Sequence, residues 1–443
     1  MRILVVWPPQ VPSYFNAGHH LPVFSVAAYL RDQGHETVAV DAGALNFTWK
    51  DFADLLWQGD FQLIFLVNEF DVVEGVRRAA DYCRAIAPTA KLCTFGRLSF
   101  QVPDFFQSLQ LDGIGYSGDY EAIAKNFASW VQAECQETTL PGVTVRLPAG
   151  WTPRVVPGEQ LPPEQWVLPA TSEIPYGAYD RLYSRDQSKF CGIPDRRELV
   201  VPVARGCPVN CEFCDVPVMQ GLRERRLPIG RTVAYIRDSF ALGGFEYVAF
   251  YAPTFTLDRK WTVGLCGELR SQPRVYPWKC ATTLHSLDEE LVRLMGDSGC
   301  VRISVGLETL EKPALELLPR AKRKHIDEFS MVAGWCQEAG IELNCFVIAG
   351  LPGTTVEGVR ATLGLVAGAG ARSRPTLYTP YHEMHGGLSE AELSQFNRQV
   401  PVPSQYEQLT QGQWAEVYAI LFGRDGYATP APGLVDAGNL PGS

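Results

Sequence analysis

Three cysteines of this chain, Cys207, Cys211 and Cys214, stand in the short run Arg-Gly-Cys-Pro-Val-Asn-Cys-Glu-Phe-Cys. Thiolates at this spacing on one loop can bind three corners of a cubane iron-sulfur cluster, as short cysteine runs do in ferredoxins. No fourth cysteine follows nearby, so one iron would have no protein ligand. The run therefore predicts a [4Fe-4S] cluster with one iron open to a ligand that the protein does not supply.

Two other interpretations of these cysteines remain as alternatives. Structural zinc usually takes four ligands, often as two separated pairs, and the chain has no CxxC or HxxxH partner elsewhere. A lone cysteine is more often a buried, inert core residue. We expect this second fate for six others: Cys83, Cys93, Cys266, Cys300, Cys336 and Cys345.

Length and composition predict a cytoplasmic enzyme of two domains. The chain has 443 residues, more than one ordinary core holds, and it shows neither a signal peptide nor an apolar stretch long enough for a bilayer. Twelve cysteines at this length indicate reduced thiols and a metal centre rather than disulfides. The net charge of −10 and the lack of a long basic run argue against nucleic acid. The short basic cluster at 223–226 is expected to be a solvated helix entry.

The elements that must position the cysteines follow two α/β patterns. In residues 1–131, short apolar runs alternate with helix-period segments, which predicts a doubly wound parallel sheet. Ligands of such sheets sit at the carboxyl ends of the strands. The expected strands are Arg2–Val6, Thr37–Val40, Leu63–Val67, Lys91–Phe95 and Gly113–Tyr116, and the expected helices include Ser25–Gln33 and Val72–Ala87.

The second α/β pattern follows a proline-rich segment, residues 132–198, which we interpret as a linker. Residues 199–380 hold six strand-helix units and predict a partial (β/α)6 TIM barrel, whose chemistry gathers at the carboxyl ends of the strands. Residues 381–443 form a tail with one predicted helix, 406–422. The expected barrel strands are Leu199–Val203, Tyr247–Tyr251, Trp278–Thr282, Val301–Val305, Ile341–Val347 and Pro375–Tyr378, and the helices are Thr232–Leu242, Arg259–Ser271, Asp288–Asp297, Ile326–Ala339 and Val356–Ala367.

The cysteine run resembles the CxxxCxΦC motif of radical S-adenosylmethionine (SAM) enzymes, with Phe213 at Φ, and the chain resembles their cobalamin-binding-domain class over about residues 1–380. Softer matches are Pro8-Pro9, the helix end before His35, Val305-Gly-Leu-Glu308 and Gly350-Leu-Pro-Gly353. The resemblance implies a [4Fe-4S] cluster, SAM and cobalamin as cofactors, a small-molecule substrate, and an electron donor such as flavodoxin or ferredoxin. It implies neither a nucleic acid nor a membrane partner.

The resemblance also implies which barrel residues bind SAM. The backbone at Phe213 would meet the adenine, Ser304 and Glu308 would face the ribose or methionine end, and Ile348, Leu351 and Pro352 would line the adenine. The class commonly has Asp-Asp-x-Phe-Thr after the second barrel strand, whereas this chain has Ala-Pro-Thr-Phe-Thr at 252–256. Thr254, a backbone carbonyl or another acid, with Glu308 as the leading candidate, must then serve the amino group of SAM.

The N-terminal half departs from the class at the expected cobalamin tail. Arg97 follows Gly96 where a second glycine is usual, and it would either crowd the tail or pair with its phosphate. The class typically has Gly-Glu-Gly-Glu later in this half, whereas this chain has Ser-Gly-Asp-Tyr-Glu at 117–121, in which Gly118 is second. No Asp-x-His-x-x-Gly motif offers a histidine to cobalt, and we interpret His19 and His20 as hydrogen-bonding or solvated loop residues rather than cobalt ligands.

The reaction type stays open between two classes. Cobalamin-dependent methylation at an unactivated carbon of a small natural-product intermediate is the first, and cobalamin-independent dehydration or rearrangement of an aminosugar-like diol is the second. A non-catalytic iron-sulfur scaffold is a third and weaker reading, since a scaffold needs no open iron. Just after the sixth barrel strand, His382 and Glu383 are the candidate catalytic acid-base pair, and His385 shares their run.

Overall fold

The computed structural model describes residues 1–9, 20–70, 73–136, 138–185, 193, 196–323, 326–398, 400–405 and 409–422. The chain divides into two compact units. The first comprises Met1–Glu246 with Thr379–Val402, and the second comprises Tyr247–Tyr378 with the chain from Pro403. The boundaries expected at residues 131 and 198 both fall inside the first unit, so the predicted linker packs as part of it.

The first unit is built on a seven-stranded sheet of order β2-β1-β3-β4-β5-β6-β7. Its first five strands are parallel and nearly all buried, because runs such as Ile-Leu-Val-Val must be covered on both faces. The order of the strands switches sides between β1 and β3, because β2 lies on one side of β1 and the later strands lie on the other. A doubly wound sheet accepts ligands at this switch point. The strands are β1 (Arg2–Trp7), β2 (Glu36–Asp41), β3 (Leu63–Asn68), β4 (Lys91–Gly96) and β5 (Gly113–Gly115).

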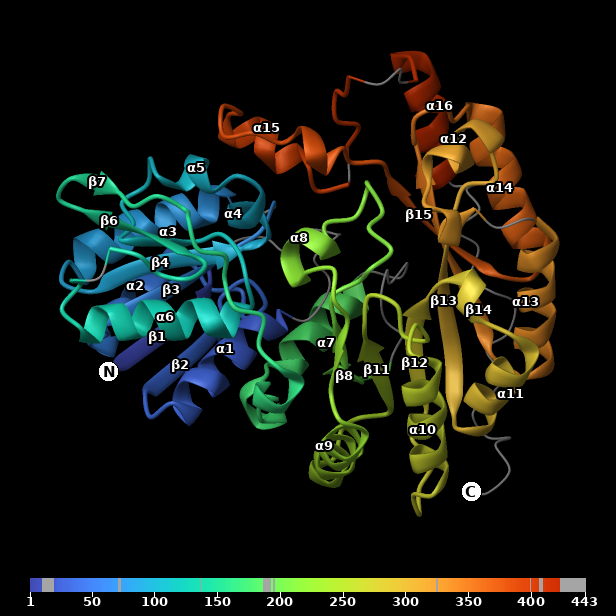
Figure 1. Ribbon diagram of the computed structural model, residues 1–443, viewed down its shortest axis with the longest axis horizontal. Helices are drawn as coiled ribbons and strands as arrows, with labels where there is room; N and C mark the ends of the chain where they lie inside the picture. The colour runs from blue at the N-terminus through green and yellow to red at the C-terminus, as the bar shows by residue number, and fades with distance from the viewer. Residues whose placement is uncertain are drawn as a thin grey trace. The chain divides into compact units, whose positions relative to one another are not determined.

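Helices connect the parallel strands of this sheet. α1 (Leu21–Asp32) packs against α6 (Tyr120–Gln132), and α2 (Trp49–Gly59) packs against α3 (Val73–Ile86) (Figure 1). The start of α2 is fixed by a capping box in which Thr48 accepts a hydrogen bond from the Asp51 amide. Two short helices, α4 (Arg97–Gln101) and α5 (Pro103–Phe106), follow β4.

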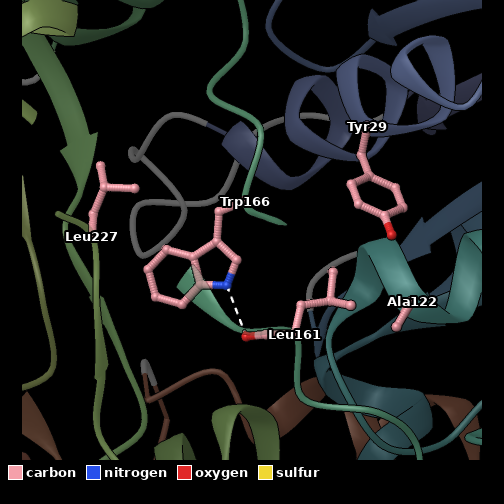
Figure 2. Packing of buried hydrophobic residues seen from close by; sticks show 5 residues of the cluster. All are labelled: Tyr29, Ala122, Leu161, Trp166 and Leu227. Carbon is pink, nitrogen blue, oxygen red and sulfur yellow. Dashed lines mark hydrogen bonds between the residues drawn. The ribbon is translucent and has the colours of Figure 1, made fainter. Parts of the chain in front are cut away.

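The proline-rich segment is not only a linker. It contributes β6 (Val143–Leu147) and β7 (Gly150–Trp151), which extend the sheet in antiparallel register from β5, and the helix α7 (Tyr176–Arg185). Flanking prolines hid the short Val-Thr-Val alternation of β6 from the sequence pattern. Trp166 then closes a small core with Leu161, Leu227 and residues of α1 and α6, and its indole N–H donates to the Leu161 carbonyl at 3.1 Å (Figure 2).

The remainder of the first unit carries the cysteine run. It follows β8 (Glu198–Pro202) and β9 (Ala204–Arg205), and α8 (Val216–Gln220) comes next. The basic cluster forms the strand β10 (Arg225–Arg226), antiparallel to β9, with the Arg225 side chain buried. The prediction of a solvated helix entry is therefore wrong. Arg225 is buried because it pairs with Asp119, which is distant in the sequence. The unit is completed by α9 (Ile229–Leu242), the 3-10 turn η6 (Tyr381–Glu383) and α15 (Glu390–Gln395).

The second unit holds a parallel sheet in which β11 to β15 are neighbours in chain order. Each expected strand and helix of this region is present, so the predicted α/β fold with two parallel sheets is confirmed. Asp258, Asp288 and Thr355 cap the helices that follow the strands. The strands are β11 (Tyr247–Tyr251), β12 (Trp278–Thr282), β13 (Cys300–Glu308), β14 (Glu342–Ala349) and β15 (Arg372–Leu377). The helices are α10 (Arg259–Arg270), α11 (Glu289–Asp297), α12 (Lys312–Leu317), α13 (Ile326–Glu338), α14 (Val356–Gly368) and α16 (Gln411–Phe422).

The tail helix begins later than predicted, at Gln411, and positions 406–408 of the prediction lie outside the described residues. Within the described part of the chain, no helix combines the length and apolar character needed to cross a membrane.

Candidate functional site

The cysteine loop is held at its base by backbone hydrogen bonds. The amide of Cys207 donates to the Gly221 carbonyl at 3.1 Å, and the amide of Cys214 donates to the Cys211 carbonyl at 3.0 Å. Gly206 enters the loop with φ of +85°, and a Cβ there would lie 2.1 Å from the Arg223 carbonyl oxygen. Only glycine satisfies both demands, so the first cysteine is fixed by the backbone that precedes it.

The donor set fits an iron-sulfur cluster. Cys207, Cys211 and Cys214, called here the cluster cysteines, are free thiols, the first two buried and the third partly buried. Burial raises the pKa of the Cys214 thiol, and the Asp215 carboxylate adds to this rise. Within the described residues, no three His, Cys, Asp or Glu side chains converge on one metal ion. Thiolates of a cubane cluster bind different irons, so they need not converge on one point.

The other six cysteines expected to be inert are all buried. Burial raises the pKa of Cys83 to about 12, so its thiol stays protonated at neutral pH. Their expected role as core residues is confirmed.

Arg97 lies against the residue that follows the cluster cysteines. Its Nε donates to Asp215 Oδ2 at 2.5 Å, and its Nη1 is 3.3 Å from Glu69 Oε2. The guanidinium also lies 4.9 Å from the centroid of the Phe70 ring. Burial alone would lower the pKa of Arg97, but Asp215 and Glu69 raise that pKa well above its usual value. Arg97 is therefore paired with carboxylates. Tyr120, the first residue of α6, packs against the rings of Phe95 and Phe100.

A second, partly buried arginine reaches the same loop from the tail. Arg398 donates from Nε to the Tyr381 hydroxyl at 2.9 Å and from Nη2 to the Phe213 carbonyl at 3.5 Å. Tyr381 in turn stacks on Phe70, with ring centroids 5.2 Å apart. Arg398 has φ of +65°, a conformation that costs a non-glycine residue energy and often marks a functional position. Sequence reasoning missed Arg398, because no motif surrounds it.

The predicted acid-base pair also lies beside the cluster loop. His382 Nε2 is 3.5 Å from Glu212 Oε1 and 3.6 Å from Glu383 Oε1. Glu212 stands between two of the cluster cysteines, so the structure brings His382 beside the cluster loop, a position that the sequence did not predict. His385 instead accepts a hydrogen bond from the Gly387 amide at 3.2 Å on the surface.

At the two glycines expected near the cobalamin tail, the protein's own backbone leaves no room for a side chain. A Cβ on Gly96 would lie 1.8 Å from the Asn68 carbonyl oxygen, and one on Gly118 would lie 2.7 Å from the backbone of Gly158. Internal packing therefore explains both glycines without a ligand. They give no independent support for a corrin tail.

A buried histidine at the same edge does have an unsatisfied atom. His20 Nδ1 lies 2.7 Å from Asp41 Oδ2, which also accepts from the Tyr179 hydroxyl, and the imidazole stacks on Trp7 at 3.6 Å. Its Nε2 is buried and has no hydrogen-bond partner among the described residues. Burial alone would raise the pKa of Asp41, but His20, the Ala44 amide and the Tyr179 hydroxyl together hold that pKa below its usual value. His20 is therefore hydrogen-bonded, as expected, and its free nitrogen fits an additional group at this edge. His19 lies outside the described residues.

In the second unit, the expected SAM-binding residues gather at the carboxyl ends of adjacent strands. Glu308 of β13 is in register with Val347 of β14, beside Ile348, and Thr254 follows β11. The Asn344 amide donates to Ser304 Oγ at 3.1 Å, while Asn344 Oδ1 is buried without a hydrogen-bond partner among the described residues. An acceptor without a partner beside a hydroxyl group suits the hydroxyls of a ribose. Asn344 was not among the residues predicted from the sequence. Leu351 is buried and Pro352 is partly buried, just beyond β14.

Glu308 is strained and already paired. Its φ is +62°, and its carboxylate accepts from Lys322 Nζ at 2.8 Å, with 5% and 11% of the two side chains exposed. A buried carboxylate at a strand end in the left-handed region agrees with a binding role, but the lysine gives it a structural partner as well.

Comparisons with known proteins show which proteins this chain is similar to. Residues 201–366 match the sequence model of the radical SAM superfamily. An uncharacterised methyltransferase of Pyrococcus horikoshii is 27% identical over 375 residues, which cover 82% of this chain and 77% of the relative.

Two solved structures share the fold of both units. TsrM from Kitasatospora setae, a radical SAM methyltransferase with cobalamin and a [4Fe-4S] cluster bound, gives a TM-score of 0.68 at 17% identity, covering 86% of this chain and 76% of TsrM. OxsB, a cobalamin-dependent radical SAM enzyme with aqua-cobalamin and SAM bound, gives 0.66 at 15% identity, covering 89% of this chain and 56% of OxsB. Residues 201–366 are thus similar to the radical SAM superfamily, and the chain shares the fold of these two structures.

Proposed function

We propose that this chain is a cobalamin-dependent radical SAM methylase that acts at an unactivated carbon of a small natural-product intermediate. The observation that carries the proposal is the similarity of most of the chain, N-terminal sheet included, to TsrM and OxsB. The similarity to a named methyltransferase over 82% of the chain supports it.

The cluster cysteines would hold the [4Fe-4S] cluster through the loop that Gly206 and the backbone bonds fix. When bound, the cluster and SAM supply a one-electron cleavage that yields a carbon radical, and an electron donor such as flavodoxin or ferredoxin would provide the electron. The protein's task is to hold SAM and exclude water. The buried carboxyl ends around Ser304, Glu308 and Ile348 suit that task.

SAM carries an amino group, a carboxylate and a ribose, each of which needs a polar partner. Glu308 and Thr254 would bind the amino group, and Ser304 with Asn344 would bind the ribose hydroxyls through the free Asn344 Oδ1. Ile348, Leu351 and Pro352 would line the adenine.

Cobalamin would lie at the carboxyl edge of the N-terminal sheet, where His20 Nε2, which has no hydrogen-bond partner among the described residues, fits an added group. When bound, it supplies a methyl group for transfer to carbon. The edge residues would orient it, with Gly96, Arg97 and Gly118 nearest the expected tail. Close to the cluster loop, His382 with Glu383 would accept or hold a proton of the substrate.

A second candidate is the cobalamin-independent dehydration or rearrangement of a diol. The observation that favours it is that internal packing accounts for Gly96 and Gly118, so neither glycine needs a corrin tail to explain it. In that reaction, His382 would be the acid-base group for the departing hydroxyl.

The test is an anaerobically purified chain reconstituted with iron, sulfide and hydroxocobalamin, followed by gel filtration. We expect about four irons per chain and a corrin absorbance band that elutes with the protein. A protein that retains the cluster but binds no corrin would contradict the methylase and favour the second candidate.

A further inference from the structure

The loop that carries the cluster cysteines is joined to the edge of the N-terminal sheet by buried charges. Asp215 directly follows Cys214 and accepts a hydrogen bond from Arg97, the first residue of α4. Side-chain exposure is 21% for Arg97, 9% for Asp215 and 14% for Glu69. In such surroundings a charge acts over a longer distance than in water, because little solvent screens it.

The same contact set continues through aromatic rings to the middle of the loop. Arg97 lies over Phe70, Phe70 stacks on Tyr381, and Tyr381 accepts from Arg398, which also donates to the Phe213 carbonyl. The residues on either side of Cys214 are therefore both held, one by Arg97 and one by Arg398.

We propose that Arg97 and Asp215 form a charged pair that positions Cys214 and sets the reduction potential of the bound cluster from the edge of the N-terminal sheet. Arg97 is thus a positioning residue of the cluster and not a ligand of a corrin phosphate. The proposal rests on the proposed cluster ligation by the cluster cysteines. It concerns no step of methyl transfer.

The proposal predicts opposite shifts of the cluster's midpoint potential when Arg97 or Asp215 is neutralised. Reduction adds a negative charge to the cluster, so a nearby positive charge favours it and a negative charge opposes it. Arg97→Gln should lower the midpoint potential, and Asp215→Asn should raise it. At the short range set by chain adjacency, each change should alter the reduction equilibrium on the order of tenfold, which is ~59 mV for one electron. The double variant should return close to wild type.

The experiment is an anaerobic redox titration followed by the EPR signal of the reduced cluster, without substrate or cobalamin. Iron content is measured for each variant, and Arg154→Gln serves as the control, since Arg154 pairs with Asp104 on the surface. Arg97→Lys retains the charge and should keep a potential near wild type. If a neutral variant loses its iron, Glu69→Gln gives the second measurement, because removing this carboxylate should raise the potential as Asp215→Asn does.

Shifts of the same sign in Arg97→Gln and Asp215→Asn, or a shift in Arg97→Lys as large as in Arg97→Gln, would overturn the proposal. Potentials unchanged in cluster-loaded Glu69→Gln and Asp215→Asn would do the same. A wild-type chain that binds no cluster would instead contradict the cluster assignment, so the two failures are distinguishable.

Discussion

Replacing Asp119 by Ala should destabilise the first unit more than any surface change. Asp119 begins α6, and its carboxylate accepts from Arg225 at 2.6 and 3.0 Å and from the Leu161 amide at 3.1 Å. Arg205 lies 3.1 Å away and covers the Trp166 ring. This network ties the start of α6 to the β9–β10 pair that flanks the cluster loop.

The magnitude follows from burial. Only 2% of the Asp119 side chain and 7% of the Arg225 side chain are exposed, so removal of the carboxylate leaves a buried charge uncompensated. Breaking such a pair costs about 3–5 kcal/mol. For domains of this size, 1 kcal/mol lowers Tm by roughly 2–4 °C, so the expected fall is roughly 6–20 °C.

The matched control is Asp104→Ala, which breaks an Asp-Arg pair with Arg154 whose carboxylate is 58% exposed. A surface pair contributes about 0–1 kcal/mol, so this variant should lose at most ~4 °C. Both are measured by circular dichroism during heating, under nitrogen and at equal iron content. Equal Tm losses in the two variants would refute the reasoning that burial makes the Asp119 pair strong.

Three further predictions concern the site. Replacing any one cluster cysteine by Ala should open a second iron and abolish reductive cleavage of SAM, whereas iron content near four per chain after replacing all three would contradict the assignment. Glu308→Gln should weaken SAM binding about tenfold by calorimetry, while Lys322→Met should mainly lower Tm; equal affinities in both variants and wild type would return Glu308 to a purely structural role. The pKa of Asp41 is depressed, so its carboxylate stabilises the fold above its unfolded pKa and this contribution is lost as pH falls through the folded pKa. The cost of Asp41→Asn in urea unfolding should therefore be large at pH 7 and shrink below about pH 3.9, and a cost independent of pH would contradict this.

Much of the fold was predictable because its strands are continuous apolar runs. Buried parallel strands such as Leu63–Asn68 must be apolar on both faces, and the helices between them are capped and periodic. The strand β6 was hidden because it is short, lies among prolines and joins the sheet only through long-range pairing with β5. Local pattern cannot show such pairing.

The site was predictable only where its residues are consecutive. The cluster cysteines form a local motif, whereas the contact of His382 with Glu212 of their loop joins segments far apart in the sequence. Arg398, Asn344 and the partners of Arg97 depend on contacts between distant segments. Charge and burial at these positions emerge only when the chain is folded.

One measurement tests the proposed function most directly. The reconstituted enzyme receives a candidate substrate, reductant and methyl-labelled SAM, with and without hydroxocobalamin, and the product is analysed for label and mass. The methylase proposal predicts a labelled, methylated product that forms only when cobalamin is present. Turnover that is unaffected by cobalamin and leaves no label in the product would contradict it.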